Sequence, residues 1–310
     1  MTRYGSTATR WYCSVDVLKR AVGIAGADRD TVLAFYVEAA SADIETLLGR
    51  RFIPETAEKL FRWPPARGGG SVLGLDDLDL LAVTSLKAKA QDSSPTTIAA
   101  ADYFLEPANL GPPYRRIEID LSSSAAFEAG DTPQRSISVT GRWGYSEDTK
   151  AAGALAEADD GSEVALDVTD ASLIDVGDTI LIGSEAMFVS AKAALTTGTT
   201  LNDTLTADQN DVTVTLTSGA AVKQGEVILL DSEKMLVESI SSNDLTVKRA
   251  YDGSVLAAHS TGITVYAYRT LTVIRAVNGT TAATHSSAAA ITKYAPPADI
   301  VELCLAMAVG

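Results

Sequence analysis

Two histidines are the first residues of this sequence that could do chemistry, and both belong to a repeat. His285 follows His259 by 26 residues. Arg275 follows Arg249 by the same step of 26 residues. An imidazole can act as a general base or a metal ligand near neutral pH, but neither histidine has a cysteine or glutamate at ligand spacing. We therefore interpret the histidines as structural residues of a shared turn. We interpret the arginines as structural partners across neighbouring strands, rather than residues that bind another molecule.

The carboxylates suggest two further kinds of site. A pair of carboxylates can do acid/base work, and Glu185 and Glu233 occupy equivalent positions 48 residues apart. Each, however, follows a serine between two apolar runs, which is typical of a hairpin turn. Asp76, Asp77 and Asp79 could coordinate calcium, but the glycine and terminal glutamate of a calcium-binding loop are missing. The patterns therefore predict two hairpins and one solvated acidic loop.

The remaining candidates also favour structural roles. Gly68–Ser71 is glycine-rich but lacks the Lys-Ser/Thr of a phosphate-binding loop. Met187 and Met235 stand in strand patterns, where core packing is the usual role of methionine. Cys13 and Cys304 are the only cysteines, which excludes a disulfide framework or a zinc cluster and predicts reduced core residues. We predict no catalytic, cofactor-binding or metal-binding residues, and a protein that is not an enzyme.

Composition limits the class of protein. The chain has 310 residues, of which 46% are hydrophobic, and a formal net charge of −15. This length allows about two or three domains with real cores. The negative charge argues against a nucleic-acid-binding surface, and it suits a surface along which DNA passes without sticking. No signal peptide opens the chain and no apolar run reaches membrane length, so we expect neither secretion nor a membrane.

An internal repeat organises the second half of the chain. Its front half occurs as Gly177–Val189 and again, 48 residues later, as Gly225–Val237. Its back half occurs as Leu245–Tyr268 and again, 26 residues later, as Leu271–Tyr294. The order along the chain is front, front, back, back. Such repeats decide the architecture of a fold.

This order predicts that one β module is nested inside another. The inner module is expected over residues 195–268, and the outer module over residues 162–194 and 269–294. A front half alone leaves an unpaired strand edge, which its own back half can cover. Nesting therefore predicts two cross-strand pairs: Val189 with Val273, and Val237 with Val247. The alternative is a tandem array with two decayed halves, in which Val189 pairs with Val212 or Val214.

Helices are expected at both ends of the chain. Met1–Tyr12 is polar and is expected to form an arm, and Ser14 is a suitable N-cap for a helix over Val15–Val22. Near the other end, Pro297 begins a helix over Ala298–Met307 that is apolar almost all round. Such a helix must be buried against its own fold or a neighbouring subunit. Because both ends present large apolar faces, we expect them to come together in space.

A longer helix follows the first one. Asp28 or Asp30 is expected to cap it, and Gly49 follows its last residue, Leu48. Apolar residues recur at helical spacing on one face: Leu33, Val37, Ala40, Ile44 and Leu47. Polar residues are expected on the opposite face: Glu38, Ser41 and Glu45.

Short β-strands are predicted between the longer helix and the repeat. They cover five segments: 57–63, 80–88, 103–106, 116–121 and 136–143. Ala151–Gly161 is small, acidic and alanine/glycine-rich, and is expected to be the linker at a domain boundary. Residues 1–150 and 295–310 then form one core domain, interrupted by the β modules. The predicted fold class is α+β: a small helical core with β-hairpins, and an inserted all-β region, β-sandwich or barrel-like, made of two nested modules.

The order of these elements resembles a known family. The residues that carry the resemblance lie in six short segments: Ile44–Phe52, Trp63–Pro64, Val83–Leu86, Tyr103–Leu105, Ile137–Tyr145 and Pro297–Ile300. In this order they resemble the gp6-like head–tail connector (adaptor) proteins of long-tailed bacteriophages. In that family the last helix follows the Gly-Tyr hairpin end almost at once, whereas here residues 146–296 intervene.

The resemblance implies a location and partners. It implies a non-enzymatic ring of about twelve identical subunits, made in the host cytoplasm and placed in the neck of the virion. The portal protein would lie above the ring and a tail-completion (stopper) or tail protein below it. DNA would pass through the channel without sequence-specific binding. The resemblance implies no cofactor and no membrane.

A second interpretation stays open: a tail or baseplate module that binds carbohydrate or a host surface through its β repeats. The repeats contain few aromatic residues for stacking on sugars, which weakens this interpretation: Phe188, Tyr251, Tyr266, Tyr268 and Tyr294. A cell-wall hydrolase is a third interpretation, for which the sequence offers no catalytic set.

Overall fold

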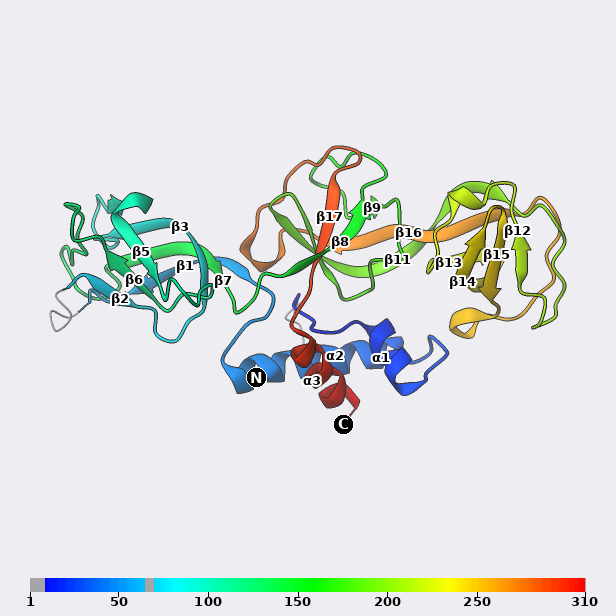
Figure 1. Ribbon diagram of the computed structural model, residues 1–310, viewed down its shortest axis with the longest axis horizontal. Coiled ribbons are helices and arrows are strands. Elements are labelled where there is room, and N and C mark those ends of the chain that lie inside the picture. Colours follow the sequence, from blue (N-terminus) through cyan, green and yellow to red (C-terminus); the bar gives the residue numbers. More distant parts are fainter. Residues whose placement is uncertain (1–8, 65–69, 310) are drawn as a thin grey trace.

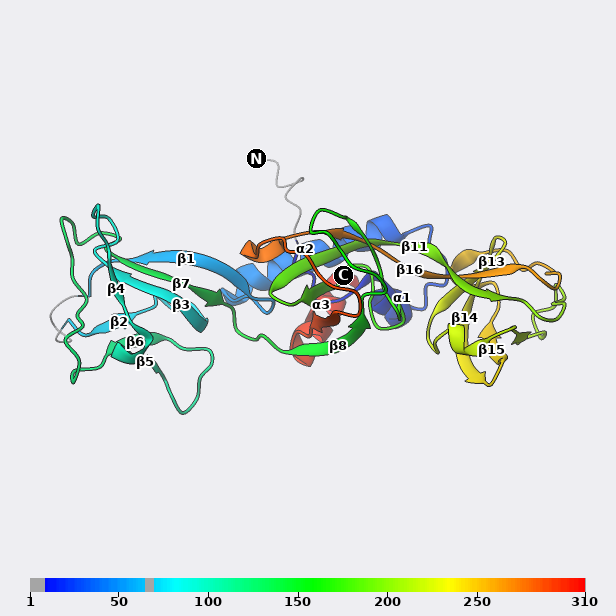
Figure 2. The ribbon, with the colours of Figure 1, turned by 90° about the horizontal axis from the view of Figure 1, so that it is seen from above.

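A computed structural model describes residues 9–64 and 70–309. Within these residues the fold is α+β and mostly β, with three α-helices and three antiparallel sheets, the largest of ten strands. The molecule is elongated, as Figures 1 and 2 show from two directions. Three β lobes lie in a row, and the helices lie against the middle lobe (Figure 1).

The helices from the two ends of the chain form one bundle. α1 spans Val15–Val22, α2 spans Asp30–Leu48 and α3 spans Ala298–Val309. α3 contacts both α1 and α2, and all three contribute to one hydrophobic core. The expectation that the two helical ends come together is confirmed. We call this unit the helical bundle.

Helix α1 begins and ends as predicted. The side chain of Ser14 accepts a hydrogen bond from the backbone N–H of Val17 at 3.2 Å. Gly23 follows the last residue with φ 72°, a left-handed conformation that glycine adopts without steric cost.

The segment before α1 is packed on the fold where it is described, so the expectation of a polar arm is wrong for Thr9–Tyr12. Tyr12 is buried. The ring of Trp11 lies edge-on to the ring of Phe188, with 5.2 Å between centroids. The apolar area of these aromatic rings outweighs the polarity of their neighbours. Met1–Ala8, the rest of the expected arm, lies outside the described residues.

The predicted cap of helix α2 is wrong. Neither Asp28 nor Asp30 is the N-cap, which is Arg29, and its side chain makes no capping hydrogen bond. Asp30 is instead the first helical residue, where a negative charge interacts favourably with the helix dipole. Gly49 ends the helix as predicted, with φ 63°.

The faces of α2 follow the prediction except at two residues. Four of the expected apolar positions are buried: Leu33, Val37, Ala40 and Ile44. Leu47 is 73% exposed, because the cover of the bundle ends before the last turn. Ser41, expected on the polar face, is buried. Its hydroxyl donates to the carbonyl of Val37 at 2.8 Å and accepts from the N–H of Tyr12 at 3.1 Å, so its polar group is satisfied inside the bundle.

Helix α3 is buried on one side only. Ile300, Cys304 and Ala308 face the core of the bundle. Leu303 is 37% exposed and Val309 is 59% exposed. This helix was expected to be buried. One face is covered by the bundle of the same chain, and the other face is exposed.

The lobe at residues 55–143, the first β unit, holds two small sheets. One has the order β1-β7-β3-β4 and the other the order β2-β6-β5. The bounds are β1 Glu55–Phe61, β2 Val72–Gly74, β3 Leu80–Ala88, β4 Thr96–Ile98, β5 Tyr103–Glu106, β6 Arg116–Ile119 and β7 Ile137–Trp143. β3 and β5 have the predicted bounds, and β1, β6 and β7 begin and end within two residues of them. The apolar residues of this unit form a cluster separate from the helical core.

The predicted linker is wrong in part. Residues 149–154 form β8 (Thr149–Ala154), which pairs with β17 (Ala290–Tyr294). Ala152 is fully buried. Small side chains, which suggested a linker, here let the strand lie close against the sheet.

The large sheet joins both repeat modules. Its order is β12-β15-β14-β13-β16-β11-β10-β17-β8, and β9 also pairs with β16. The remaining bounds are β9 Ala165–Asp167, β10 Thr179–Ile182, β11 Glu185–Thr200, β12 Thr213–Thr215, β13 Val227–Leu230, β14 Glu233–Ser241, β15 Asp244–Lys248 and β16 Thr264–Ile274. β11 and β16 are long and run from the middle lobe into the third lobe (Figure 1).

The strand pairs are those that nesting predicts. Val189 pairs with Val273, and Val237 pairs with Val247. Val214 pairs with Leu245, so the tandem alternative is wrong. Two hydrophobic clusters lie side by side along the sheet, one in each module. The two modules do not form separate sheets, because β11 and β16 run through both modules.

Candidate functional site

The repeated glutamate, arginine and histidine of the inner module meet in one buried network. Arg249 donates from Nε and Nη2 to the two carboxylate oxygens of Glu233, each at 2.8 Å, and both side chains are fully buried. The ring of His259 lies between two carboxylates. Its Nε2 is 3.0 Å from Glu233, and its Nδ1 is 2.9 Å from Asp231. The expectation that Arg249 has a structural cross-strand partner is confirmed.

The outer module repeats this network with one exchange. Arg275 donates to Glu185 from Nε at 3.0 Å and from Nη2 at 2.7 Å, and His285 Nε2 lies 3.0 Å from Glu185. The second acid is Asp159, which accepts from Nη1 of Arg275 at 2.7 Å. Gly183 occupies the turn position that Asp231 has in the inner module.

These networks keep their glutamates ionised. Burial raises the pKa of Glu233, but hydrogen bonds from Arg249, His259 and two backbone N–H groups outweigh it and lower the pKa to about 2. The pKa of Glu185 is lowered in the same way, against burial, first by Arg275. Both carboxylate oxygens of Glu233 and of Glu185 accept hydrogen bonds from donors of the chain itself. The network closes a hairpin onto its back half, as predicted for the turns at both glutamates.

The repeat also carries a pair of docking loops. η4 (Tyr251–Gly253) and η5 (Val277–Gly279) are equivalent turns that follow the two arginines. In η4, Asp252 accepts from Nζ of Lys19 in α1 at 2.6 Å. In η5, Asn278 accepts from Nη1 of Arg10 at 2.9 Å. In each module, therefore, the equivalent turn contacts the N-terminal part of the chain, at Lys19 or at Arg10.

Glycine is required in both docking loops. Gly279 has φ 76°, and a Cβ there would lie 2.0 Å from the carbonyl oxygen of Thr56 in β1. Gly253 has φ 74°, and a Cβ there would lie 3.3 Å from the Cα of Gly26. Their positive φ angles and close backbone neighbours disfavour any other residue.

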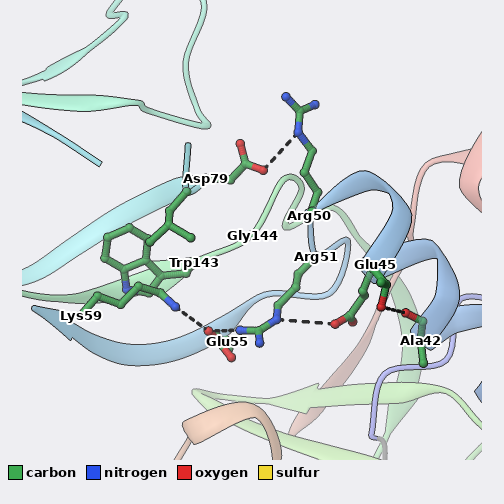
Figure 3. Close-up of a pocket in the computed structure, with 12 residues that line it drawn as sticks. Ala42, Glu45, Arg50, Arg51, Glu55, Lys59, Asp79, Trp143 and Gly144 are labelled. Carbon is green, nitrogen blue, oxygen red and sulfur yellow. Dashed lines mark hydrogen bonds and ion pairs between the residues drawn. The ribbon is translucent and has the colours of Figure 1, made fainter. Parts of the chain in front are cut away.

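A charged cleft of about 410 Å³ lies between the last turn of α2 and the first β unit (Figure 3). Its charged lining residues are Glu45, Arg50, Arg51, Glu55, Lys59 and Asp79, beside the ring of Trp143. Figure 3 shows Arg51 between Glu45 and Glu55, with Lys59 on the far side of Glu55. Arg50 reaches away from them toward Asp79.

The charges of this cleft compensate one another. Arg51 Nε is 3.6 Å from Glu45, and Lys59 Nζ is 2.9 Å from Glu55. Lys59 also lies 5.3 Å from the ring centroid of Trp143, a cation–π distance. Each of these charges therefore has an opposite charge of the same chain beside it.

Asp79 corrects the prediction of a solvated acidic loop. Asp76 and Asp77 are exposed as expected, but Asp79 is 6% exposed. Its Oδ1 lies 2.7 Å from Nη2 of Arg115. Burial raises the pKa of Asp79 although Arg115 and Arg50 act against it. An arginine more than thirty positions along the chain, which local sequence does not reveal, permits this burial.

A second cleft, of about 340 Å³, lies where α1 meets both modules. It is lined by Asp16, Asp175, Lys192, Tyr251 and Tyr268 among others. Burial raises the pKa of Asp16 and lowers the pKa of Lys192. Lys192 donates to the carbonyl of Ala171 at 2.8 Å, so its ammonium group already has a partner within the chain.

The other residues singled out in the sequence have the following places. Met187 and Met235 are fully buried in the two module cores, as predicted. Cys13 and Cys304 are free and buried, as predicted. Of Gly68–Ser71, Gly68 and Gly69 lie outside the described residues. Over residues 9–64 and 70–309, no three His, Cys, Asp or Glu side chains are grouped to hold a metal ion.

No family model, curated protein or solved structure matches the chain. Among the described helices, none is long and apolar enough to cross a membrane.

Proposed function

We propose that this chain is a structural virion protein that forms a ring-shaped head–tail connector in a bacteriophage. The observation that carries the proposal is the helical bundle. α3, at the end of the chain, completes the core that α1 and α2 begin, although the β modules stand between them in sequence. This arrangement supports the connector resemblance, in which the last helix belongs to the same core as the first two.

An apolar stripe on α2 supports assembly with a second copy of the chain. Val32, Tyr36 and Leu47 are 51%, 47% and 73% exposed. Their spacings of four and eleven residues place them on one face of the helix. Leu48, 46% exposed, adjoins them where the charged cleft begins. Soluble monomers rarely leave such a patch in water, whereas a subunit interface covers it.

The partners follow from the ring. Each subunit of a closed ring needs two different surfaces, one for each neighbour. We place the α2 stripe with the adjoining cleft on one of them. The ring lies between the portal protein and a tail-completion or tail protein, and DNA passes through it. The net charge of −15 supports a channel wall that does not hold DNA.

Native mass spectrometry and electron microscopy of the purified full chain test this proposal. We expect a closed ring of about twelve subunits, and antibody labelling at the neck of the particle. A protein that stays monomeric at every concentration, and that labels the tail tip or baseplate, would contradict the proposal and favour the surface-binding module.

A further inference from the structure

The two cysteines of the chain lie against each other. Cys13 precedes the cap of α1 and Cys304 lies in the middle of α3, 291 residues later. Their sulfur atoms are 3.3 Å apart inside the helical bundle. Cys13 is 7% exposed and Cys304 is fully buried. The chain has no other cysteine, so both of its thiols meet at the point where its two ends join.

The surroundings make Cys304 the more acidic thiol of the pair. The contact with Cys13 lowers the pKa of Cys304 to about 7, against burial. The same contact raises the pKa of Cys13. The hydroxyl of Ser41 lies 3.5 Å from the Cys304 sulfur. A thiolate is the nucleophilic form of cysteine, so the contact between the two sulfurs favours the reactive form of one member of the pair.

We propose that Cys13 and Cys304 form a redox modification site that closes into an intramolecular disulfide and locks the two ends of the chain together. The oxidant is a peroxide small enough to reach a nearly closed site. The thiolate of the pair attacks one oxygen of hydrogen peroxide, the O–O bond breaks, and the leaving hydroxide takes up a proton to give water. The resulting sulfenic acid is attacked by the sulfur of the other cysteine, 3.3 Å away before the reaction. The S–S bond forms, and the sulfenic oxygen leaves as a second water with the proton of that second thiol. Two thiols are oxidised and one peroxide is reduced to two waters.

The geometry requires little movement. A disulfide bond is about 2.05 Å long, so the sulfurs must approach by roughly 1.2 Å from their separation of 3.3 Å. Cys13 lies in the segment before α1, outside any helix, and this segment can make the adjustment without disturbing a helix. The reducing cytoplasm keeps such a pair as thiols, and an oxidising exterior allows the disulfide.

The disulfide has a mechanical consequence. It links the first described residues to the last helix, so the covalent loop contains nearly the whole chain. A cross-link over so long a loop restricts the unfolded state strongly. It also prevents α3 from leaving the bundle. This inference does not depend on the proposed function, because it concerns the folding of one chain.

Peroxide oxidation of the full chain tests the site. Protein purified under dithiothreitol is treated with hydrogen peroxide, and its intact mass and tryptic peptides are measured. We expect a loss of two hydrogen atoms and a cross-link between peptides 11–19 and 294–310. We also expect a Tm raised by about 5 °C, reversed by dithiothreitol. The variant Cys13→Ser should show neither the mass loss nor the rise in Tm.

Three results would overturn the proposal: higher oxidation of Cys304 without a cross-link, dimers joined between chains, or a cross-link that leaves Tm unchanged or lowered. The peptide map of the wild-type protein decides the first two even if Cys13→Ser does not fold.

Discussion

Asp252 and Asn278 occupy the same position in the two back halves of the repeat, and each joins its module to the helical end of the chain. Asp252 binds Lys19 at 2.6 Å, and Asn278 binds Arg10 at 2.9 Å. Both residues have positive φ angles, of 53° and 54°, a conformation that asparagine and aspartate tolerate best among residues with a side chain. The same turn thus joins each β module to the N-terminal part of the chain. The acceptor is a charged carboxylate in the inner module and a neutral amide in the outer module.

The first prediction separates turn shape from charge in the inner docking loop. Asp252→Asn keeps the left-handed turn but removes the ion pairs with Lys19 and Lys234. Both ion pairs are mostly buried, so we expect a loss of about 1–2 kcal/mol in the free energy of unfolding, measured by urea denaturation. Hydrogen exchange should rise in η4 and α1 and stay unchanged in η5. Asp131→Asn, at an exposed position, is the matched control. An unchanged exchange rate in α1 would show that the contact does not hold the module.

The second prediction concerns the buried pair of the inner network. Glu233→Gln leaves the fully buried guanidinium of Arg249 without its counter-charge. Breaking a buried ion pair on one side costs about 3–5 kcal/mol, so the inner module should unfold at lower urea than the outer one. Near-UV circular dichroism and hydrogen exchange can follow the two modules separately. Leu205→Ala in the same core removes volume but no charge, and serves as the control. A uniform, small loss in both modules would count against the network as the closure of the inner module.

The third prediction is an acid dependence of stability. The pKa of Glu233 is about 2 in the folded chain, against an ordinary value of 4.5 for a glutamate. Since the folded pKa is depressed, its contribution is complete above the unfolded pKa and is lost as the pH falls through the folded value. We expect the free energy of unfolding to fall between pH 4.5 and pH 2, the interval between these two values. Glu233→Gln should flatten this part of the profile. An equal slope in the variant and the wild type would contradict this assignment.

The fourth prediction tests nesting by removing the inner module. Leu195 of β11 pairs with Ala267 of β16, so residues 196–266 can be replaced by Asn-Gly, which favours a two-residue hairpin turn. Arg269→Thr is included because its partner Glu226 is deleted with the module. We expect a folded chain that keeps cooperative unfolding and the helical circular dichroism. A soluble but unfolded product, with random-coil amide shifts in β10 and β17, would show that the outer module cannot close without the inner one.

The fifth prediction concerns the α2 stripe. Leu47→Glu places a charge in the proposed subunit interface, and since Leu47 is 73% exposed the single chain should keep its Tm. We expect the mass of the assembly to fall to that of the monomer, as measured by light scattering. Leu110→Glu is the control, because Leu110 is 83% exposed and lies in the first β unit. An intact ring in Leu47→Glu would remove α2 from the interface, and disruption by both variants would show a general effect of charge.

Much of the fold could be predicted because it depends on local sequence patterns. The cap at Ser14, the end of α2 at Gly49 and the bounds of β3 follow from spacing and side-chain type over a few residues. The pairs Val189–Val273 and Val237–Val247 are distant in sequence. They could still be predicted, because a repeat constrains which halves can cover each other's edges.

Three of the failures share one physical cause. Ser41 looked like a surface residue and Asp79 like a solvated one, yet both are buried against partners elsewhere in the chain. Ala152 looked like part of a linker, but it is buried in β8, the strand at the end of the sheet that pairs with β17. Burial of a polar or small residue is decided by the groups it meets, and those groups have no fixed distance from it in sequence.

By itself, then, the sequence determined the elements, the repeat and the nesting order, since each depends on periodicity or on similarity between segments. Only the tertiary structure decided which side chains converge. Glu233, Arg249 and His259 were singled out one by one in the sequence, and the signal that they belong together was that each has a copy, at an offset of 48 residues for the glutamate and 26 for the arginine and the histidine. Their contacts in one network, and the contact of Cys13 with Cys304, could be known only from the path of the folded backbone. The reason is that hydrogen bonds and sulfur contacts act over about 3 Å, a distance that only the folded backbone sets.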